Sequence, residues 1–404
     1  MKWSLIFFSV LFAAATTARA DDWPQWRGPE RNGVSQEKGW LDQWPDQGPA
    51  IAWKANVGLG FSSFVVAGGK AITVGHAEEK DTVFCFDAVS GTTTWKHSYP
   101  SDLGDKYFDG GTTGSPTIDG DRVYWLSRWG DLFCLNFADG KVVWQRQLQK
   151  EADAQVPTWG FAGAATVYNN LLLLNIGEAG MAVDKKTGKT AWESAKKDAG
   201  YSTPLPIKRA GRDELLLGNG QGYLAVDPAS GKEFWRMKWL TQYGVNAADP
   251  IPVGDAIFIS TGYGKGAAFI KPPAAEGEPE VVWKSKVLRT QLSPGVLVDK
   301  FIYGADGDTT DKAALKCIEA QTGVEKWAHR GFGTGGLIVA DGKLIAITGY
   351  GELMVAPATP DSFKPMSQAQ VLGGQTWTAP VLANGFVYCR NSKGDIVAVD
   401  LRKK

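Results

Sequence analysis

Clustered carboxylates and a glycine-rich segment are the two features of this sequence whose residue types and spacing could do chemistry. The segment DGDTTD places Asp306, Asp308 and Asp311 close together, and such carboxylates could hold calcium. It lacks the later bidentate glutamate of an EF-hand, so a solvated turn is the alternative interpretation. The segment GFGTGG, residues 331–336, fits the glycine pattern of dinucleotide sites. The sequence after it reads as two strands, whereas phosphate binding requires a helix N-terminus there.

The chain has three histidines and four cysteines, and neither set has a catalytic or metal-binding spacing. Neither an HExxH motif nor a GxSxG motif is present, so zinc and serine-hydrolase chemistry have no support. The four cysteines fall within expected strands. Cys85, Cys134 and Cys317 occupy a repeat position that is alanine in other copies, and Cys389 lies in the strand FVYCR. We therefore predict small buried cysteines without disulfides, no catalytic residues and no metal site.

The strongest pattern in the chain is an eleven-residue repeat. The stretch AVDPASGKEFW, residues 225–235, returns as CFDAVSGTTTW, CLNFADGKVVW, AVDKKTGKTAW and CIEAQTGVEKW. Each copy has short polar residues before a glycine, which accepts the positive φ of a tight turn, and a tryptophan four positions after it. A catalytic site is not repeated five times along one chain. The pattern therefore predicts a strand, a turn and a second strand, with the tryptophan as a packing element.

A further predicted hairpin precedes each copy, so that one repeating unit contains four short strands. The tryptophans recur every 42 to 49 residues, which is the period of propeller blades. They are Trp53, Trp95, Trp144, Trp192, Trp235, Trp283 and Trp327. Two units are irregular: the insertion KPPAAEGEPE widens the turn before Trp283, and ELMVAPATPDSFK occupies a repeat slot without a tryptophan.

The two ends of the chain each contain part of a unit. The sequence ends at IVAVDLRKK, a unit cut off after Asp400, while AIAWKANVG around Trp53 is an outer strand with nothing before it. These halves complete each other. We predict an all-β fold, an eight-bladed β-propeller over residues 40–404, closed by N-terminal and C-terminal strands that share one blade. Such closure removes exposed sheet edges.

These tryptophan-docking repeats, of the form AVDKKTGKTAW, resemble those of the pyrroloquinoline-quinone-like (PQQ-like) eight-bladed β-propellers. The resemblance covers almost all of the chain that follows the predicted signal peptide, and it implies that the seven repeat tryptophans wedge between neighbouring blades. The family includes quinoprotein dehydrogenases and also cofactor-free members, such as the propeller lipoprotein of the outer-membrane barrel assembly machinery. Methanol-dehydrogenase-like members resemble one another in an adjacent cysteine pair, which this chain lacks. We expect no cofactor, with pyrroloquinoline quinone and calcium as the alternative.

The N-terminal residues have the features of an export signal followed by an extended segment. Residues 1–20 combine an early lysine, an apolar run and Ala18-Arg19-Ala20, so we predict a signal peptide cleaved after Ala20 and a periplasmic or secreted protein. No cysteine near it could carry a lipid anchor, and the apolar run is too short to span a bilayer comfortably. Residues 21–39 form a predicted extended strap. We expect Trp23 and Trp26 to pack against the propeller, with a plug or a partner-recognition role as the alternative.

Aromatic residues outside the repeats mark the candidate ligand site. Trp159 and Trp377 precede innermost strands, and Trp129 lies in a turn between second and third strands. In a propeller both kinds of loop open on one face around the central channel. The predicted ligand-binding residues are Trp129, Trp159, Trp377, Tyr201, Tyr243, Arg128 and Arg289. The same alignment places further residues in these loops: Phe61, Tyr107, Gln291, Phe332, Tyr263, Asp306 and Tyr350. Packing of these aromatic side chains across the channel is the alternative.

Function is less determined by the sequence than fold is. The formal net charge is zero, and no basic face is visible, which argues against nucleic acid and anionic membranes as partners. Because every catalytic signature is absent or degenerate, the leading hypothesis is an exported, non-catalytic binding or scaffold protein with a protein, peptide or saccharide ligand. The alternatives are a quinone-dependent oxidoreductase and a carbohydrate-binding propeller.

Overall fold

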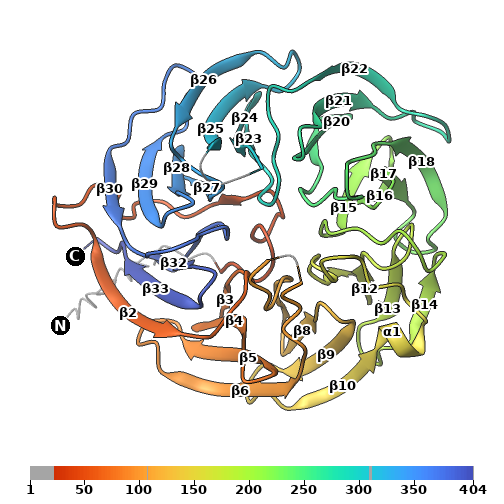
Figure 1. The fold of residues 1–404 in the computed structure, drawn as a ribbon, viewed down its shortest axis with the longest axis horizontal. Helices are drawn as coiled ribbons and strands as arrows, with labels where there is room; N and C mark the ends of the chain where they lie inside the picture. Colours follow the sequence, from red (N-terminus) through yellow and green to blue (C-terminus); the bar gives the residue numbers. More distant parts are fainter. Residues whose placement is uncertain (1–21, 107, 309–311, 404) are drawn as a thin grey trace, which may run out of the picture.

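The computed structural model describes residues 22–106, 108–308 and 312–403 of the chain (Figure 1). These residues form eight sheets arranged as a ring of blades around a central axis. Each blade contains four antiparallel strands, and one blade carries an additional parallel strand. The prediction of an eight-bladed β-propeller is thereby confirmed. The predicted signal peptide, residues 1–20, lies outside the described residues.

Blades 1 to 4 follow one another along the chain, and in each the first strand lies innermost. Blade 1 contains β3 Val65–Ala67, β4 Lys70–Ala77, β5 Lys80–Asp87 and β6 Thr93–Pro100. Blade 2 contains β7 Thr117–Asp119, β8 Arg122–Leu126, β9 Asp131–Asn136 and β10 Val142–Gln147, which the short helix α1 Leu148–Glu151 follows. Blade 3 contains β11 Thr166–Tyr168, β12 Leu171–Leu174, β13 Met181–Asp184 and β14 Thr190–Glu193. Blade 4 contains β15 Leu205–Arg209, β16 Arg212–Gly218, β17 Gly222–Val226 and β18 Glu233–Lys238.

Blades 5 to 8 complete the ring, and the last two include strands from the N-terminal part of the chain. Blade 5 contains β19 Ile251–Val253, β20 Ala256–Thr261, β21 Gly266–Lys271 and β22 Glu280–Ser285. Blade 6 contains β23 Val296–Val298, β24 Phe301–Asp306, β25 Ala314–Glu319 and β26 Glu325–Arg330. Blade 7 contains β1 Val34–Ser35, β27 Gly336–Ala340, β28 Lys343–Ile347, β29 Glu352–Pro357 and β30 Ser367–Gln370. Blade 8 contains β31 Val381–Ala383, β32 Phe386–Arg390, β33 Asp395–Asp400 and β2 Ala50–Asn56.

Burial within a blade explains why the middle strands have nearly continuous apolar sequences. Every residue of β12 and of β20 is buried, because neighbouring blades cover both faces of these strands. The outermost strand β10 is mostly exposed or half-buried, and its sequence is correspondingly more polar. The hydrophobic core is therefore divided into clusters around the ring, several of which combine residues of two adjacent blades.

Blade 8 is built from both ends of the chain. Strand β2 pairs antiparallel with β33, and Trp53 lies opposite Ala398. β33 pairs in turn with β32 of the same blade. The two partial units of the sequence thus form one sheet (Figure 1), and the predicted closure of the ring is confirmed. Without β2, the edge of β33 would lack its hydrogen-bonding partner.

The repeat tryptophans connect each blade to the next. The Trp192 indole donates a hydrogen bond to the carbonyl oxygen of Pro228, at 3.1 Å, and its ring covers Gly231 in the turn of blade 4. A Cβ at Gly231 would lie 2.6 Å from that ring, so the glycine supplies close approach as well as its φ of 74°. Six tryptophans have this bond to a turn carbonyl: Trp53 to Ala88, Trp95 to Phe137, Trp144 to Lys185, Trp192 to Pro228, Trp283 to Ala320 and Trp327 to Thr359.

Trp235 is the exception among the seven. Its indole donates to the Glu214 carboxylate of its own blade at 3.3 Å, because the Pro-rich insertion replaces the usual turn in blade 5. Glu214 is fully buried and also accepts hydrogen bonds from Arg209 and Arg212. The Arg209 guanidinium also donates hydrogen bonds to the carbonyl oxygens of Pro272 and Pro273 in the insertion. A buried ionic cluster thus connects blades 4 and 5 in place of the usual tryptophan contact.

The N-terminal segment before β2 enters the central channel (Figure 1). Trp23 exchanges two backbone hydrogen bonds with Val66 of β3, and the carbonyl oxygen of Pro24 accepts from the amide of Ile118 in β7. Trp23 is almost completely buried. The segment therefore lies against the innermost strands of blades 1 and 2 rather than across the outside of the ring.

The same segment turns and leaves the channel beside blades 7 and 8. Residues 25–31 reverse direction through turns in which Gly28 and Arg31 have positive φ. Strand β1 then runs parallel to β27, and the Glu37 carboxylate accepts the amide of Gly385 in the turn between β31 and β32 at 2.9 Å. We call residues 22–37 the channel hairpin. No helix among the described residues has the length and apolar character needed to cross a membrane.

Candidate functional site

A cavity of about 320 Å³ lies at one end of the central channel. Its wall comes mainly from the loops that precede the innermost strands, and we call this end of the ring the pocket face. The lining residues are Trp26, Phe61, Phe108, Thr113, Ser115, Trp159, Ala162, Ala164, Tyr201, Thr203, Val245, Ala247, Asp249, Tyr263, Gln291, Leu292, Asp308, Trp377 and Thr378. Ligand sites typically combine such an apolar, aromatic wall with few polar groups.

Two groups of aromatic rings form the wall of the cavity. Phe61 stacks on Trp377 with a centroid separation of 5.2 Å and packs against Phe108 at 5.8 Å. In the other group, Trp159 meets Tyr201 edge to face at 6.0 Å. These contacts hold the rings in fixed orientations, so the wall is formed before any ligand arrives.

The channel hairpin supplies the floor of the cavity. Trp26 donates its indole hydrogen to the Asp249 carboxylate at 2.7 Å, and both residues line the cavity. The second oxygen of Asp249 accepts the backbone amide of Thr203 at 2.7 Å. Arg27 holds the hairpin beside them by donating to the carbonyl oxygen of Gly295 at 2.9 Å. The channel is therefore blocked below the cavity by a segment from the beginning of the chain.

Asp249 and Asp308 are the charged residues in the lining. Burial raises the pKa of Asp249, although Arg27 and the hydrogen bonds from Trp26 and Thr203 act in the opposite direction. Asp308 accepts the backbone amides of Tyr263 and Gly264 at 2.6 and 3.2 Å. The lining among the described residues contains no lysine, arginine or histidine, so acidic groups dominate its charge.

Three of the predicted ligand-binding residues reach the cavity: Trp159, Tyr201 and Trp377. The Tyr201 side chain is buried, and burial raises its pKa to about 12, so its phenol stays neutral and can donate a hydrogen bond. Phe61, Tyr263 and Gln291, which the alignment of loops also places here, belong to the lining as well. Tyr107 lies outside the described residues.

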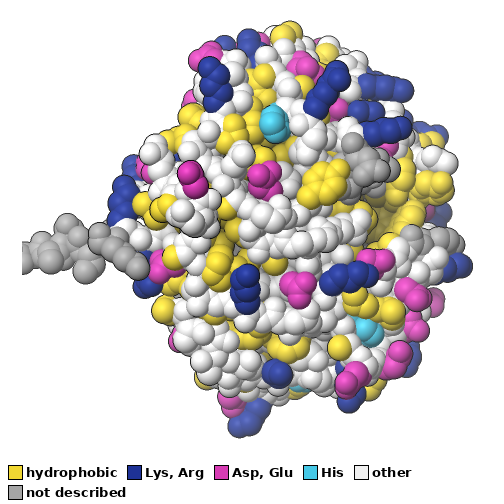
Figure 2. All heavy atoms as spheres, turned by 60° about the vertical axis from the view of Figure 1, so that its left-hand side comes forward, with side chains coloured by type: hydrophobic (Ala, Val, Ile, Leu, Met, Phe, Trp, Pro, Cys, Tyr) yellow, Lys and Arg dark blue, Asp and Glu magenta, His cyan; other side chains and the backbone are white. Residues whose placement is uncertain are grey.

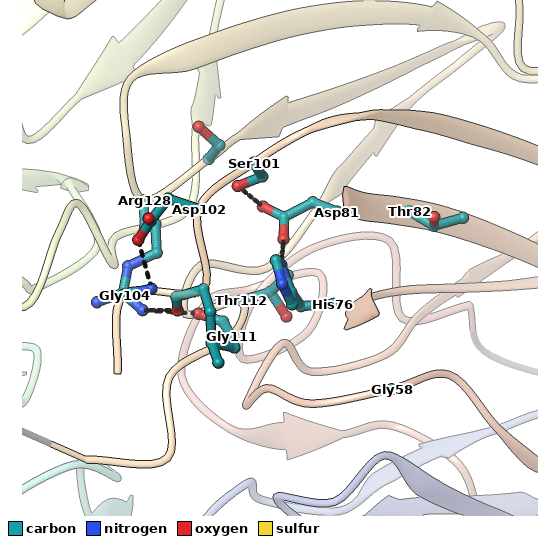
Figure 3. A network of polar contacts seen from close by, with 12 residues as sticks. Gly58, His76, Asp81, Thr82, Ser101, Asp102, Gly104, Gly111, Thr112 and Arg128 are labelled. Carbon is teal, nitrogen blue, oxygen red and sulfur yellow. Dashed lines mark hydrogen bonds and ion pairs between the residues drawn. The ribbon is translucent and has the colours of Figure 1, made fainter. Parts of the chain in front are cut away.

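Arg128 is directed away from the cavity. Its guanidinium donates to the carbonyl oxygens of Leu103, Gly111 and Trp159 at 2.9 to 3.1 Å, and the residue is almost completely buried. Figure 3 shows Arg128 beside Gly111. These bonds fix the loops that enter blades 2 and 3. Arg128 therefore positions Trp159 rather than contacting a ligand in the cavity.

The other predicted residues also have partners outside the cavity. Trp129 donates its indole hydrogen to the carbonyl oxygen of Asp102 at 2.9 Å. Tyr243 is 52% exposed and packs edge to face against Trp159 from the outside. Arg289 forms a bidentate ion pair with Asp306, with N···O distances of 2.9 and 3.0 Å. Loop position in the sequence places these residues on the pocket face, but not in the lining.

The carboxylates considered as calcium ligands have other partners in the structure. Asp306 contacts both Arg289 and Lys316, at 2.9 and 3.0 Å. Burial alone would raise the pKa of Asp306, but the hydrogen bonds from these two cations hold it below the usual carboxylate value. Asp308 faces backbone amides, and Asp311 lies outside the described residues. Among the described residues, no group of three His, Cys, Asp or Glu side chains could hold a metal.

Trp26, Asp249 and Phe108 are cavity residues that the sequence-based site does not include. The sequence does suggest that Trp26 packs against the propeller, but nothing in the repeat pattern aligns the N-terminal segment with the channel. Asp249 precedes an innermost strand, in the sequence AADPIPV, so its repeat position was a usable signal.

A buried polar network beside the cavity contains the residue types of a catalytic triad (Figure 3). His76 Nδ1 lies 2.8 Å from one oxygen of Asp81, while the other oxygen accepts the hydroxyls of Ser101 at 2.9 Å and Tyr99 at 3.2 Å. A nucleophilic serine would have to face the imidazole, whereas Ser101 donates to the carboxylate. Burial raises the pKa of Asp81 against these bonds. The Tyr99 hydroxyl also accepts the indole hydrogen of Trp125 in β8 at 2.6 Å, so the network connects blades 1 and 2.

The four cysteines are free and buried, as the repeat positions predict. Burial raises the pKa of Cys134 and of Cys317 to about 11, and it raises the pKa of Cys85 and Cys389 as well. Reactive cysteines need a thiolate at neutral pH and access to solvent. These thiols have neither property and act as small apolar side chains.

A family model described as "Outer membrane protein assembly factor BamB" matches residues 79–329 of this chain. Among curated proteins, no sequence matches significantly. The similar solved structures include BamB from Moraxella catarrhalis, with 15% identity, a TM-score of 0.64, and coverage of 87% of this chain and 99% of that one. Quinohemoprotein alcohol dehydrogenase from Comamonas testosteroni has 14% identity, a TM-score of 0.70, and coverage of 96% and 82%. A europium-containing methanol dehydrogenase has 13% identity, a TM-score of 0.66, and coverage of 94% and 89%.

Proposed function

Since the chain belongs to the PQQ-like β-propeller family whose model is described as outer membrane protein assembly factor BamB, we propose that it is an exported, non-catalytic binding or scaffold protein. Its ligand enters the cavity at the pocket face. The observation that carries this proposal is the preformed aromatic wall, which the channel hairpin closes from below. A wall of this kind offers stacking surface to one ligand and leaves one entrance for it.

The chemistry around the cavity supports binding rather than catalysis. Ser101 is bonded to a carboxylate, and the cysteines are buried thiols with raised pKa values. The hydroxyls of Thr113 and Thr378 in the lining donate to backbone carbonyl oxygens. These groups contribute to the shape of the cavity, and no activated nucleophile results from them.

Pyrroloquinoline quinone fits this cavity poorly. The quinone carries three carboxylates, which require cationic groups or a metal beside them, whereas the charged lining residues are Asp249 and Asp308. Arg289 and Lys316, the nearby cations, are already paired with Asp306. A quinone-dependent oxidoreductase is therefore the less supported alternative.

Export is the part of the proposal that rests on the sequence, in the leader-like residues 1–20 and the family description. The surface is consistent with a protein or peptide partner rather than nucleic acid. On the face shown in Figure 2, lysine and arginine side chains are interspersed with acidic and hydrophobic ones. A nucleic-acid site would require a continuous basic surface.

The proposal is tested by thermal shift with short peptides, neutral oligosaccharides, and pyrroloquinoline quinone with calcium. We expect a peptide or a saccharide to raise the melting temperature. Trp159→Ala should weaken this ligand three- to tenfold through loss of one stacking surface. The matched control is Trp129→Ala, which removes an indole on the same face outside the lining.

Two results would contradict the proposal. One is stabilisation by the quinone with calcium accompanied by quinone-dependent dye reduction, which would identify an oxidoreductase. The other is a ligand whose affinity falls equally in the two tryptophan variants, because such a ligand binds outside the cavity.

A further inference from the structure

The charge of the cavity has one sign. Asp249 at the floor and Asp308 in the wall are carboxylates, and the described lining has no basic residue to balance them. Arg27 approaches Asp249 from the channel hairpin and offsets part of its charge. Arg289 interacts with Asp308 electrostatically but gives its two side-chain hydrogen bonds to Asp306. Asp308 accepts the backbone amides of Tyr263 and Gly264, and among the described residues it forms no ion pair with a side-chain cation.

Two hydroxyl groups of the lining already use their hydrogens within the protein. Thr113 and Thr378 use their hydroxyl hydrogens on the carbonyl oxygens of Phe161 and Phe61. Gln291 lines the cavity, is 9% exposed, and has a buried side-chain oxygen without a hydrogen-bond partner. This oxygen has almost no accessible surface and lies against Gly262, where an added Cβ would be 1.6 Å away, so a ligand in the cavity does not reach it.

The aromatic wall favours the same kind of ligand. The faces of tryptophan and tyrosine rings attract cations, and the attraction is strongest where water is excluded. The chain already uses this contact beside the cavity, where the Arg128 guanidinium lies 5.0 Å from the centre of the Phe108 ring. A cation in the cavity would have Trp159 and Trp377 on the wall and Asp308 within the same lining.

We propose that the cavity receives a positively charged side chain of a peptide, an arginine or a lysine. This inference rests on the proposed function, since it names the ligand class of the same site. A guanidinium would combine stacking on the rings with N–H donors for Asp308, whereas an anion would meet two carboxylates. A neutral sugar could donate to the acceptors, but its binding would not depend on the charge of Asp308.

The experiment compares three blocked tripeptides, Ala-X-Ala, in which X is arginine, citrulline or glutamate. Citrulline has nearly the shape of arginine without its charge. We expect the arginine peptide to bind about tenfold more tightly than the citrulline peptide, and the glutamate peptide not to bind measurably. Asp308→Asn should remove this preference by weakening only the arginine peptide. Asp255→Asn, at an exposed turn on the opposite face, is the control.

A second measurement does not require a variant. The affinity of the wild-type protein for the arginine peptide should fall as sodium chloride is raised, while that for citrulline should not change. Equal binding of the arginine and citrulline peptides would overturn the cationic ligand and leave the binding function standing. Binding of maltotriose without binding of the arginine peptide would likewise overturn the cationic ligand and leave the binding function standing. If no peptide and no saccharide binds, both the inference and the proposed function fail.

Discussion

Gly231→Ala tests whether the repeat glycines are required by the tryptophan of the preceding blade. The added methyl group would lie 2.6 Å from Cε3 of Trp192, which is closer than real Cβ contacts allow. The residue also has a φ of 74°, which alanine adopts only with strain. Two costs therefore act together, and they must be separated.

Gly211→Ala provides the separation. Gly211 has a φ of 77°, nearly the same as that of Gly231, but no atom lies within 4 Å of the position of its added Cβ. The strain of the left-handed conformation alone should cost about 1 to 2 kcal/mol. Displacing a packed indole adds about 1 to 3 kcal/mol. We therefore expect Gly231→Ala to lower the free energy of unfolding by about 2 to 5 kcal/mol, and Gly211→Ala by only the first amount.

The assay is equilibrium urea unfolding, with Trp192→Ala as a third variant. Removing this partly buried indole should itself cost about 3 kcal/mol. Once the indole is absent, Gly231→Ala should cost no more than Gly211→Ala, because only the backbone strain remains. If the cost of Gly231→Ala is unchanged in the Trp192→Ala background, the glycine is required for its φ alone and the reasoning is refuted.

Three further outcomes are expected. Glu214→Gln should lower the free energy of unfolding by about 3 kcal/mol because it breaks a buried ionic cluster; Glu233→Gln, in an exposed pair, is the control at 0 to about 1 kcal/mol. The pKa of Asp306 is lower in the folded protein than in the unfolded chain. Its ion pairs therefore stabilise the fold fully above the unfolded pKa, and this stabilisation is lost as the pH falls through the folded pKa. Asp306→Asn should therefore destabilise at pH 7 and converge with wild type near pH 2 in urea titrations, and calcium should not stabilise either protein. Deletion of residues 398–404 removes half of β33 and should lower the melting temperature well beyond the effect of its length; an unchanged melt would contradict closure through blade 8.

The fold could be predicted because its parts repeat. Each unit contains the same turn residues and the same tryptophan. A copy whose strands are hard to predict alone can therefore be interpreted by alignment with the others. Trp235 shows the limit of this reasoning. Its sequence matches the repeat, yet its partner turn is replaced by an insertion in the next blade, and a buried glutamate takes over the hydrogen bond. The repeat describes one blade, whereas the contact depends on two.

The site was less predictable because side-chain direction is not encoded by loop position. Arg128 and Trp159 both lie in loops of the pocket face. The Arg128 side chain donates to backbone carbonyl oxygens outside the cavity, whereas Trp159 lines the cavity. The choice depends on which carbonyl groups of neighbouring loops are left unpaired, and that information is distributed over three blades. The position of Trp26 was harder to predict, because its segment has no repeat pattern. The sequence therefore does not show which strands or loops the segment lies against.

The channel hairpin also constrains the order of folding. Its residues are synthesised near the beginning of the chain, yet Glu37 pairs with Gly385, 348 positions later, and Gly33 with Val339. Contacts at such separations slow folding, because most of the polypeptide must be in place before they form. Trp23 can meet Val66 as soon as blade 1 is made, whereas Trp26 remains without Asp249 until the chain reaches blade 5. A protein arranged in this way needs its aromatic N-terminal segment kept from other chains during synthesis, and the final steps of folding join insertion of the hairpin to closure of the ring.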